Sequence, residues 1–218
     1  TNEFETPRSA GAGVNSIRID GLDNGTRYVF TIRSVTELGK ISSDYAEIEW
    51  SPAYSQNLDI LGRAIKVYAT TSTMFDSALD IYNTEGKAEV IPQSGQAFVD
   101  RGDLYVYAES STSAIMIKSP AEANNKGMET QFSTEAVVMT DNMDAALAWD
   151  TPVESSYTLK EFEVSSAKVT AGEVYFGRLV RGDGKYYFRM QIVRSGDVLI
   201  QGSGADRFVE LKISFQNT

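Results

Sequence analysis

Cysteine and histidine are both absent from this sequence of 218 residues. Without a thiolate or an imidazole, the chain cannot build a Ser-His-Asp triad, a cysteine nucleophile, a structural zinc site or a haem held by either residue. The absence of cysteine also excludes disulfides, so noncovalent packing must hold the fold together. The sequence therefore points away from most familiar catalytic centres and predicts no cofactor.

Long apolar runs and an excess of positive charge are also missing. No run of about 18 apolar residues occurs, so we expect no membrane insertion. The chain has 20 Lys and Arg residues against 30 Asp and Glu residues, which gives a net charge of −10. Such an acidic surface repels phosphate backbones and anionic lipids, so nucleic-acid binding is not expected. A cysteine-free chain fits an extracellular or cell-envelope protein, whose export signal we would expect to have been removed.

The apolar content of 42% is sufficient for a core, and the length suggests two domains. Near the start, Tyr28, Phe30 and Ile32 alternate with polar residues, which is typical of a strand with one buried side. The runs 17–22 and 46–50 alternate in the same way. Turn residues lie between these runs at 23–25 and 37–40, so the pattern predicts three consecutive antiparallel strands.

The spacing of this segment resembles the E to G strands of a fibronectin type III domain over about residues 14–52. The residues that carry the resemblance are Leu22, Gly25, Thr26, Tyr28, Phe30, Ile32, Gly39 and Ser42. The resemblance implies structural roles for Leu22, Thr26 and Tyr28, with the Tyr28 hydroxyl bonded to upstream backbone. Asn24 stands where the family often has proline. The family's earlier strands would need roughly forty more residues, so we expect a partial domain or a sheet that the next domain completes.

We place a domain boundary between residues 53 and 54, where the polar run 54–57 is interpreted as a linker. Beyond it, short runs rich in Val, Ile, Tyr and Phe recur between turn residues. They predict an all-β fold, a larger antiparallel sandwich or barrel-like domain that resembles bacterial surface-protein modules. The predicted strands lie at 62–71, 78–82, 87–91, 103–110, 114–119, 135–140, 158–169, 173–180, 185–193, 197–202 and 207–215. Short helices are predicted only at 120–124 and 141–147.

The last predicted strand should be central in its sheet or otherwise well packed, with Phe208, Leu211 and Ile213 in the core. Its neighbours Glu210 and Lys212 should face water.

The tripeptide Arg-Gly-Asp occurs twice, as Arg101-Gly102-Asp103 and as Arg181-Gly182-Asp183. In some fibronectin type III modules an exposed copy binds integrins, but neither copy lies in the segment that resembles that family. Gly and Asp are common turn residues. Ordinary β-turns are therefore the favoured interpretation of both copies, with adhesion as the alternative.

Aromatic residues make up 11% of the chain and offer a second candidate site. Sugar-binding sandwiches stack aromatic rings on pyranose faces beside carboxylates and amides. Trp149 beside Asp150, and Tyr186 or Tyr187 opposite Arg178, could line such a site. Core packing is the alternative for each aromatic residue, because strands favour them in any case.

Carboxylates provide a third candidate. Glycoside hydrolysis needs two acids at a defined separation, but thirty acids give too many pairs to select one. Oxygen-bearing side chains that could bind calcium cluster at 141–150 and at 20–24, without the EF-hand spacing. We interpret both clusters as solvated loops and predict no metal site.

The sequence favours a noncatalytic secreted or cell-surface β-sandwich protein for adhesion, glycan or partner binding. A glycan or a cell-surface protein would then be the partner. One alternative is a structural module of a surface assembly, and another is a carboxylate-based enzyme acting on glycans.

Overall fold

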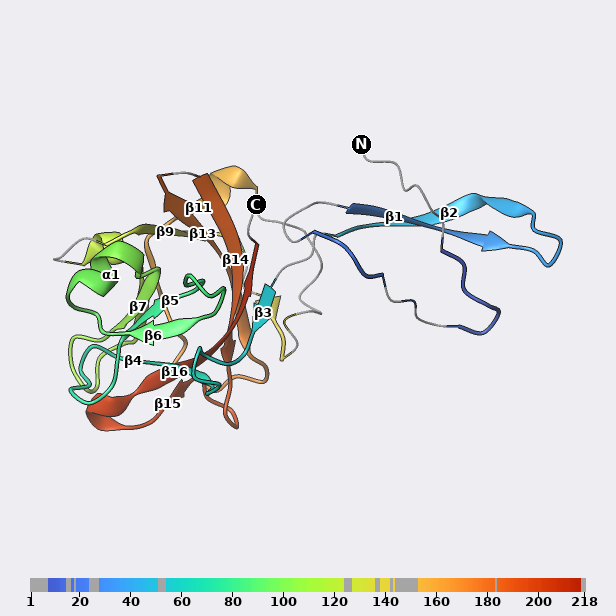
Figure 1. Ribbon diagram of the computed structural model, residues 1–218. Coiled ribbons are helices and arrows are strands. Elements are labelled where there is room, and N and C mark those ends of the chain that lie inside the picture. Colours follow the sequence, from blue (N-terminus) through green and yellow to red (C-terminus); the bar gives the residue numbers. More distant parts are fainter. Residues whose placement is uncertain are drawn as a thin grey trace.

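The computed structural model describes residues 8–14, 17, 19–23, 28–50, 54–123, 127–135, 138–141, 143, 153–182 and 184–216. The chain is mostly β, with its strands in three antiparallel sheets. Two of these sheets face one another across a shared core, and the third is a separate hairpin (Figure 1). The prediction of an all-β fold is confirmed, and its form is an open sandwich rather than a closed barrel.

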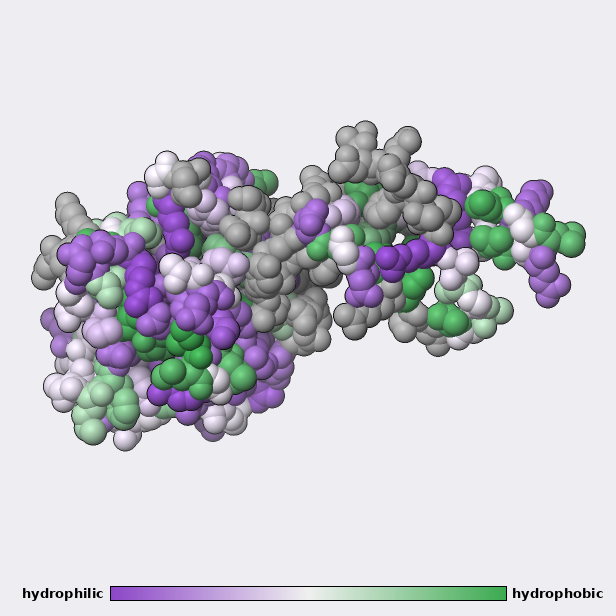
Figure 2. Space-filling model, in the orientation of Figure 1, coloured by the Kyte–Doolittle hydropathy of each residue, from purple (hydrophilic) through white to green (hydrophobic). Residues whose placement is uncertain are grey.

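The hairpin consists of β1 (Tyr28–Val35) and β2 (Ile41–Trp50), which pair with each other in antiparallel register. It lies away from the sandwich (Figure 1), and hydrophobic residues are visible on its surface at the right of Figure 2. Ile32, for example, is 58% exposed. The Tyr28 hydroxyl accepts a hydrogen bond of 2.9 Å from the backbone N–H of Asp23. This is the upstream contact implied for Tyr28; Leu22 is half-buried, and Thr26 lies outside the described residues.

The strand predicted at residues 17–22 is not formed in the described part of that segment, where residues 17 and 19–23 have no strand assignment. Gly21 has a φ of 80°. This left-handed conformation interrupts an extended run, whatever the alternation of the side chains.

The larger sheet contains nine strands, and its central path is β11-β9-β13-β14-β16-β15. These strands are β11 (Tyr157–Leu159), β9 (Glu129–Ser133), β13 (Glu173–Arg181), β14 (Gly184–Val193), β16 (Phe208–Phe215) and β15 (Ile200–Gln201). In addition, β10 (Val138–Met139) pairs with β13, while β3 (Tyr54–Gln56) and β4 (Ile65–Tyr68) pair with β16. The last strand is therefore central, as predicted.

The smaller sheet has the order β12-β8-β7-β5-β6. Its strands are β12 (Glu161–Glu163), β8 (Met116–Lys118), β7 (Leu104–Tyr107), β5 (Ala78–Asp80) and β6 (Glu89–Ile91). The helical segments are α1 (Gln96–Arg101) and the 3-10 turns η1 (Pro120–Glu122), η2 (Glu154–Ser156) and η3 (Gly204–Asp206). No helix among the described residues has both the length and the apolar character needed to cross a bilayer.

Several elements differ from the sequence-based expectations. The predicted linker at 54–57 contains β3, because polar residues can join a sheet through their backbone alone. The strand β9 and the helix α1 were not predicted. The helix α1 has no side-chain N-cap, which is the feature that most often marks a helix start in a sequence. The short helix predicted at 120–124 corresponds to η1, whereas most of the one predicted at 141–147 lies outside the described residues.

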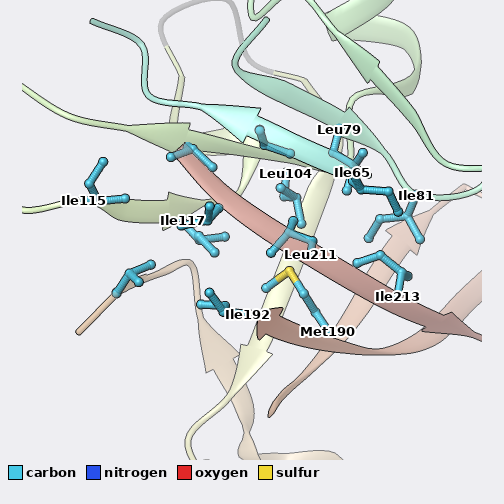
Figure 3. Packing of buried hydrophobic residues seen from close by; sticks show 14 of the residues in the cluster. Ile65, Leu79, Ile81, Leu104, Ile115, Ile117, Met190, Ile192, Leu211 and Ile213 are labelled. Atoms are coloured by element: carbon cyan, nitrogen blue, oxygen red, sulfur yellow. The ribbon is translucent and has the colours of Figure 1, made fainter. Parts of the chain in front are cut away.

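The core lies between the two sheets, where aliphatic side chains from both interdigitate (Figure 3). Leu211 and Ile213 of β16 are fully buried there, opposite Leu104 of β7. Phe208 is not part of this core. It lies an odd number of residues from Leu211, so it projects from the opposite face of the sheet and packs beside Tyr68, with ring centroids 5.0 Å apart.

The same alternation gives the larger sheet a polar outer face, the face turned away from the sandwich core. On β14, Phe188, Met190 and Ile192 point into the core, while Tyr187, Arg189 and Gln191 point outward. This outer face carries the candidate sites described below.

Candidate functional site

Two of the predicted site residues, Arg178 and Tyr187, are direct cross-strand partners on the outer face. Both contact Glu154 of η2: the Tyr187 hydroxyl donates to its Oε2 at 2.5 Å, and Arg178 Nη1 lies 2.5 Å from its Oε1. Lys185 Nζ also lies 2.5 Å from Oε1. Hydrogen bonds from Lys185 and Tyr187 lower the pKa of Glu154 to about 2, so this carboxylate stays ionised.

Arg178 is already fully engaged by the protein. It is 7% exposed, its Nε donates to Gln131 Oε1 at 3.0 Å, and its guanidinium lies 5.2 Å from the centre of the Tyr157 ring. A buried cation with this many partners holds β9, β13 and η2 together. We therefore assign Arg178 and Tyr187 to a structural network at one end of the outer face.

The other predicted aromatic residues do not join this network. Tyr186 pairs with Leu179 on the inner face, and its ring is stacked 6.2 Å from that of Phe215. Trp149 and Asp150 lie outside the described residues. The structure thus brings together Arg178 and Tyr187 of the predicted sugar site and places Tyr186 on the opposite face of the sheet.

The first Arg-Gly-Asp copy is built into the sandwich. Asp103 has an exposed fraction of 0%, and its carboxylate accepts the backbone N–H of Ile81 at 2.8 Å. Gly102 is also enclosed, since a Cβ there would lie 2.7 Å from the carbonyl oxygen of Phe98. Arg101 lies 3.0 Å from Asp80. A buried Asp103 cannot reach a receptor, which argues against an adhesive role for residues 101–103.

The second copy contributes Arg181 to the same cluster. Its Nη2 lies 2.8 and 3.1 Å from the two carboxylate oxygens of Asp103. Asp183 lies outside the described residues. Burial raises the pKa of Asp103, and burial together with the Asp103 charge raises the pKa of Asp80 to about 6. This charge cluster links the smaller sheet to β13 of the larger one.

A pocket not anticipated from the sequence lies at the other end of the outer face. Its volume is about 350 Å³, and it is open to solvent. The residues that line it are Asp141, Gln191, Val193, Arg194, Gly196 and Lys212. Gln191 on β14 and Lys212 on β16 are direct cross-strand partners, and Arg194 and Gly196 belong to the turn that follows β14.

Gln191 is the most unusual of these residues because it is a buried amide, with 1% of its surface exposed. Its Nε2 donates to the carbonyl oxygen of Thr140. This bond fixes the amide orientation, since the reverse orientation would set two oxygens against each other. The Oε1 atom then has no hydrogen-bond donor among the described residues. An unsatisfied buried acceptor costs about 1–3 kcal/mol, so its retention calls for an explanation.

Two of the three charged residues in the described lining of the pocket form an ion pair, and the third does not. Arg194 Nε lies 3.0 Å from Asp141 Oδ1, and Arg194 Nη2 lies 2.9 Å from Oδ2. The hydrogen bond from Arg194, and after it that from the N–H of Gly172, lower the pKa of Asp141. Lys212 has no ion-pair or hydrogen-bond partner in the part of the chain that the structure describes. The described lining therefore carries one positive charge in excess, in a protein of net charge −10.

Sequence reasoning overlooked this pocket for a definite reason. The alternation in 185–193 indicates that Gln191 points away from the core, but it does not reveal that β16 brings Lys212 beside it. The sequence pattern favours a solvated loop for Asp141, with calcium binding as the other possibility, whereas its carboxylate is paired with Arg194. Within the described residues, no group of three or more acids could hold a metal ion.

No family model matches the chain, and no curated protein or solved structure is significantly similar to it. The resemblance of about residues 14–52 to a fibronectin type III domain thus stays a prediction.

Proposed function

We propose that this protein is a noncatalytic saccharide-binding protein and that the pocket beside Gln191 is its binding site. The observation that carries the proposal is the buried Oε1 of Gln191, which no donor among the described residues satisfies. A ligand hydroxyl is a suitable donor, because it can bond to the amide oxygen and still accept a bond itself. Because Oε1 is covered in the empty site, binding requires a small movement of the surrounding side chains that uncovers it, and the new bond would recover the free energy that the empty site forgoes.

The chemistry of the lining favours a hydroxyl-rich ligand. Gln191, Lys212 and the Arg194–Asp141 pair are all side chains that can form hydrogen bonds with hydroxyl groups. Val193 supplies the only apolar side chain among the described lining residues. A volume of about 350 Å³ lies at the lower end of the range for small-ligand sites, which suits one or two sugar units.

The arrangement of carboxylates supports a binding function for the pocket and not a hydrolytic one. Most glycoside hydrolases use two carboxyl groups on either side of the scissile bond. Asp141 is the only carboxylate among the described residues of the pocket lining, and its oxygens are held by Arg194 and by the N–H of Gly172. Within the described lining Asp141 has no partner acid, and its pKa is lowered rather than raised.

The setting that we propose is extracellular or at the cell surface. The support is the cysteine-free sequence together with the resemblance of the first segment to a module common in surface proteins. Detection of the protein on intact cells by an antibody raised against residues 54–218 would test the setting separately from the binding.

A thermal-shift screen against mono- and oligosaccharides tests the binding. A ligand at one hundred times its dissociation constant stabilises the folded state by about 2.7 kcal/mol, so a binding sugar should raise the melting temperature measurably. The variant Gln191→Met keeps the volume of the side chain and removes the acceptor, so the shift should disappear. Gln96→Met on α1, outside the pocket, is the matched control and should retain it.

Two results would contradict the proposal. One is the absence of a shift across neutral and acidic sugars at millimolar concentration. The other is a shift that Gln191→Met leaves intact, which would place the sugar elsewhere on the protein.

A further inference from the structure

We propose that the pocket selects a saccharide unit carrying one negative charge, such as a uronic acid, and that Lys212 is the residue that selects it. This inference rests on the proposed function and adds the charge class of the ligand to it. The sheet places two cross-strand neighbours side by side at the pocket: Gln191, with its buried acceptor, and Lys212, with its positive charge.

The register of β14 and β16 fixes the relation between these two side chains. Residues directly opposite in an antiparallel pair project from the same face, with Cβ atoms about 4.5–5.5 Å apart. Both side chains line the pocket. The site therefore places an amide with an unsatisfied acceptor next to a hydrogen-bond donor that bears a positive charge, within the span of a single sugar ring.

Arg194 is less suited to this selection, because each of its three nitrogens already makes a hydrogen bond. Its Nε and Nη2 bond to Asp141, and its Nη1 donates to the carbonyl oxygen of Gly196 at 2.5 Å. The Arg194–Asp141 pair is neutral as a unit. The charge of Arg194 is thus already balanced by Asp141, whereas the charge of Lys212 is not balanced by an ion pair within the described residues.

The other charged residues near Lys212 leave its charge available. Glu210 lies two residues before Lys212 on the same outer face of β16, and the opposite charge of Lys66 stands across from Glu210 on β4. Asp141 attracts Lys212 at long range without an ion pair within 4.0 Å. A ligand carboxylate in the pocket would thus add a charge-assisted hydrogen bond that a neutral sugar cannot form.

The test compares two ligands that differ only at this group, methyl β-D-glucuronide and methyl β-D-glucoside. Their dissociation constants for the full chain are measured by titration calorimetry at low ionic strength. We expect the glucuronide to bind roughly tenfold more tightly, the range expected of one charge-assisted hydrogen bond, with the ratio falling as salt is added. In Lys212→Met the ratio should fall to about one, while weak binding of both glycosides persists.

Lys185→Met is the matched control, because this lysine lies on the same strand as Gln191 but at the Glu154 end of the outer face. It should retain the preference for the glucuronide. Circular dichroism of each variant shows whether it is folded.

The outcomes separate the two proposals. Equal affinities that Lys212→Met does not change would overturn the charge selection and leave the proposed function in place. A preference that survives in Lys212→Met would overturn the role of Lys212. If no sugar of a broad panel binds, the proposed function itself fails, and this inference fails with it.

Discussion

The carboxylate of Asp103 and the guanidinium of Arg181 form an ion pair that joins the two Arg-Gly-Asp tripeptides inside the sandwich. Asp103 begins the segment that leads into β7 of the smaller sheet, and Arg181 ends β13 of the larger one. The pair therefore connects two sheets that share no backbone hydrogen-bond ladder. Tripeptides that could be taken for adhesion motifs thus supply charges that hold the fold together.

Removal of the Arg181 side chain should lower the free energy of unfolding. The substitution Arg181→Met leaves the carboxylate of Asp103 buried without its cation, and breaking a buried pair in this way costs about 3–5 kcal/mol. Urea unfolding followed by far-UV circular dichroism measures the loss. The double variant Asp103→Asn with Arg181→Met removes the stranded charge, and its amide oxygen can still accept the Ile81 N–H, so it should recover part of the stability. A single variant as stable as the wild type would show that the pair does not stabilise the fold.

Asp80 should make stability depend on pH. Burial, and after it the charge of Asp103, raise its pKa from the usual 3.8 to about 6. An acid with a raised folded-state pKa contributes stability that is present below about pH 4 and is lost as the pH rises through 6, here about 3 kcal/mol. The stability of the wild type relative to Asp80→Asn should therefore fall by about this amount between pH 4 and pH 7. Denaturant titrations at several pH values measure the difference.

Glu154 provides the control of opposite sign. Its pKa is lowered to about 2 by the hydrogen bonds from Lys185 and Tyr187, so its contribution is present above its usual pKa of 4.5 and is lost as the pH falls toward 2. The stability of the wild type relative to Glu154→Gln should fall with decreasing pH, and only slightly, because the side chain is half-exposed. If the stability of the wild type relative to Asp80→Asn also fell with decreasing pH, as it should relative to Glu154→Gln, the raised pKa of Asp80 would be refuted.

Gly177 should be intolerant of any side chain. A Cβ at this position would lie 2.1 Å from the nearest atom of the Phe188 ring, its cross-strand partner. Gly177→Ala must therefore displace a core aromatic residue, at a cost of about 1–3 kcal/mol or more. Gly182→Ala is the matched control, since a Cβ there meets nothing within 4 Å and should change stability by less than about 1 kcal/mol. Thermal melts of the two variants would reveal the difference, and equal melting temperatures would contradict the packing argument.

The sandwich should fold without the hairpin. The described residues of β1 and β2 form their own two-stranded sheet, whereas the strands of the sandwich begin at Tyr54. A chain of residues 54–218 should keep its free energy of unfolding within about 1 kcal/mol, because the two larger core clusters contain no described residue before Ile65. Calorimetry of the shortened and full chains makes the comparison. Loss of the cooperative transition in the shortened chain would show that the first 53 residues complete the core.

The sequence by itself determined the fold class and most of the strands, and it limited the partner of Arg178 to Tyr186 or Tyr187. Alternation with period two sets which side chains of a strand share a face, and turn residues set where strands end, so these features can be read from neighbouring residues. The same rule, applied strictly, would have kept Phe208 out of the core, because it lies three residues from Leu211. The strand β3 and the helix α1 were missed because their residues carry no periodic signal.

The functional features depended on tertiary structure. Asp103 and Arg181 are 78 residues apart, and nothing local in either tripeptide indicates that they pair. Likewise, Gln191 becomes a candidate ligand-binding residue only because β16 places Lys212 beside it, while Thr140 binds its amide nitrogen and leaves the oxygen unpaired within the described residues. Burial and long-range register decide whether a polar side chain is a turn residue, a structural ion or a binding group, and these two quantities exist only once the chain has folded.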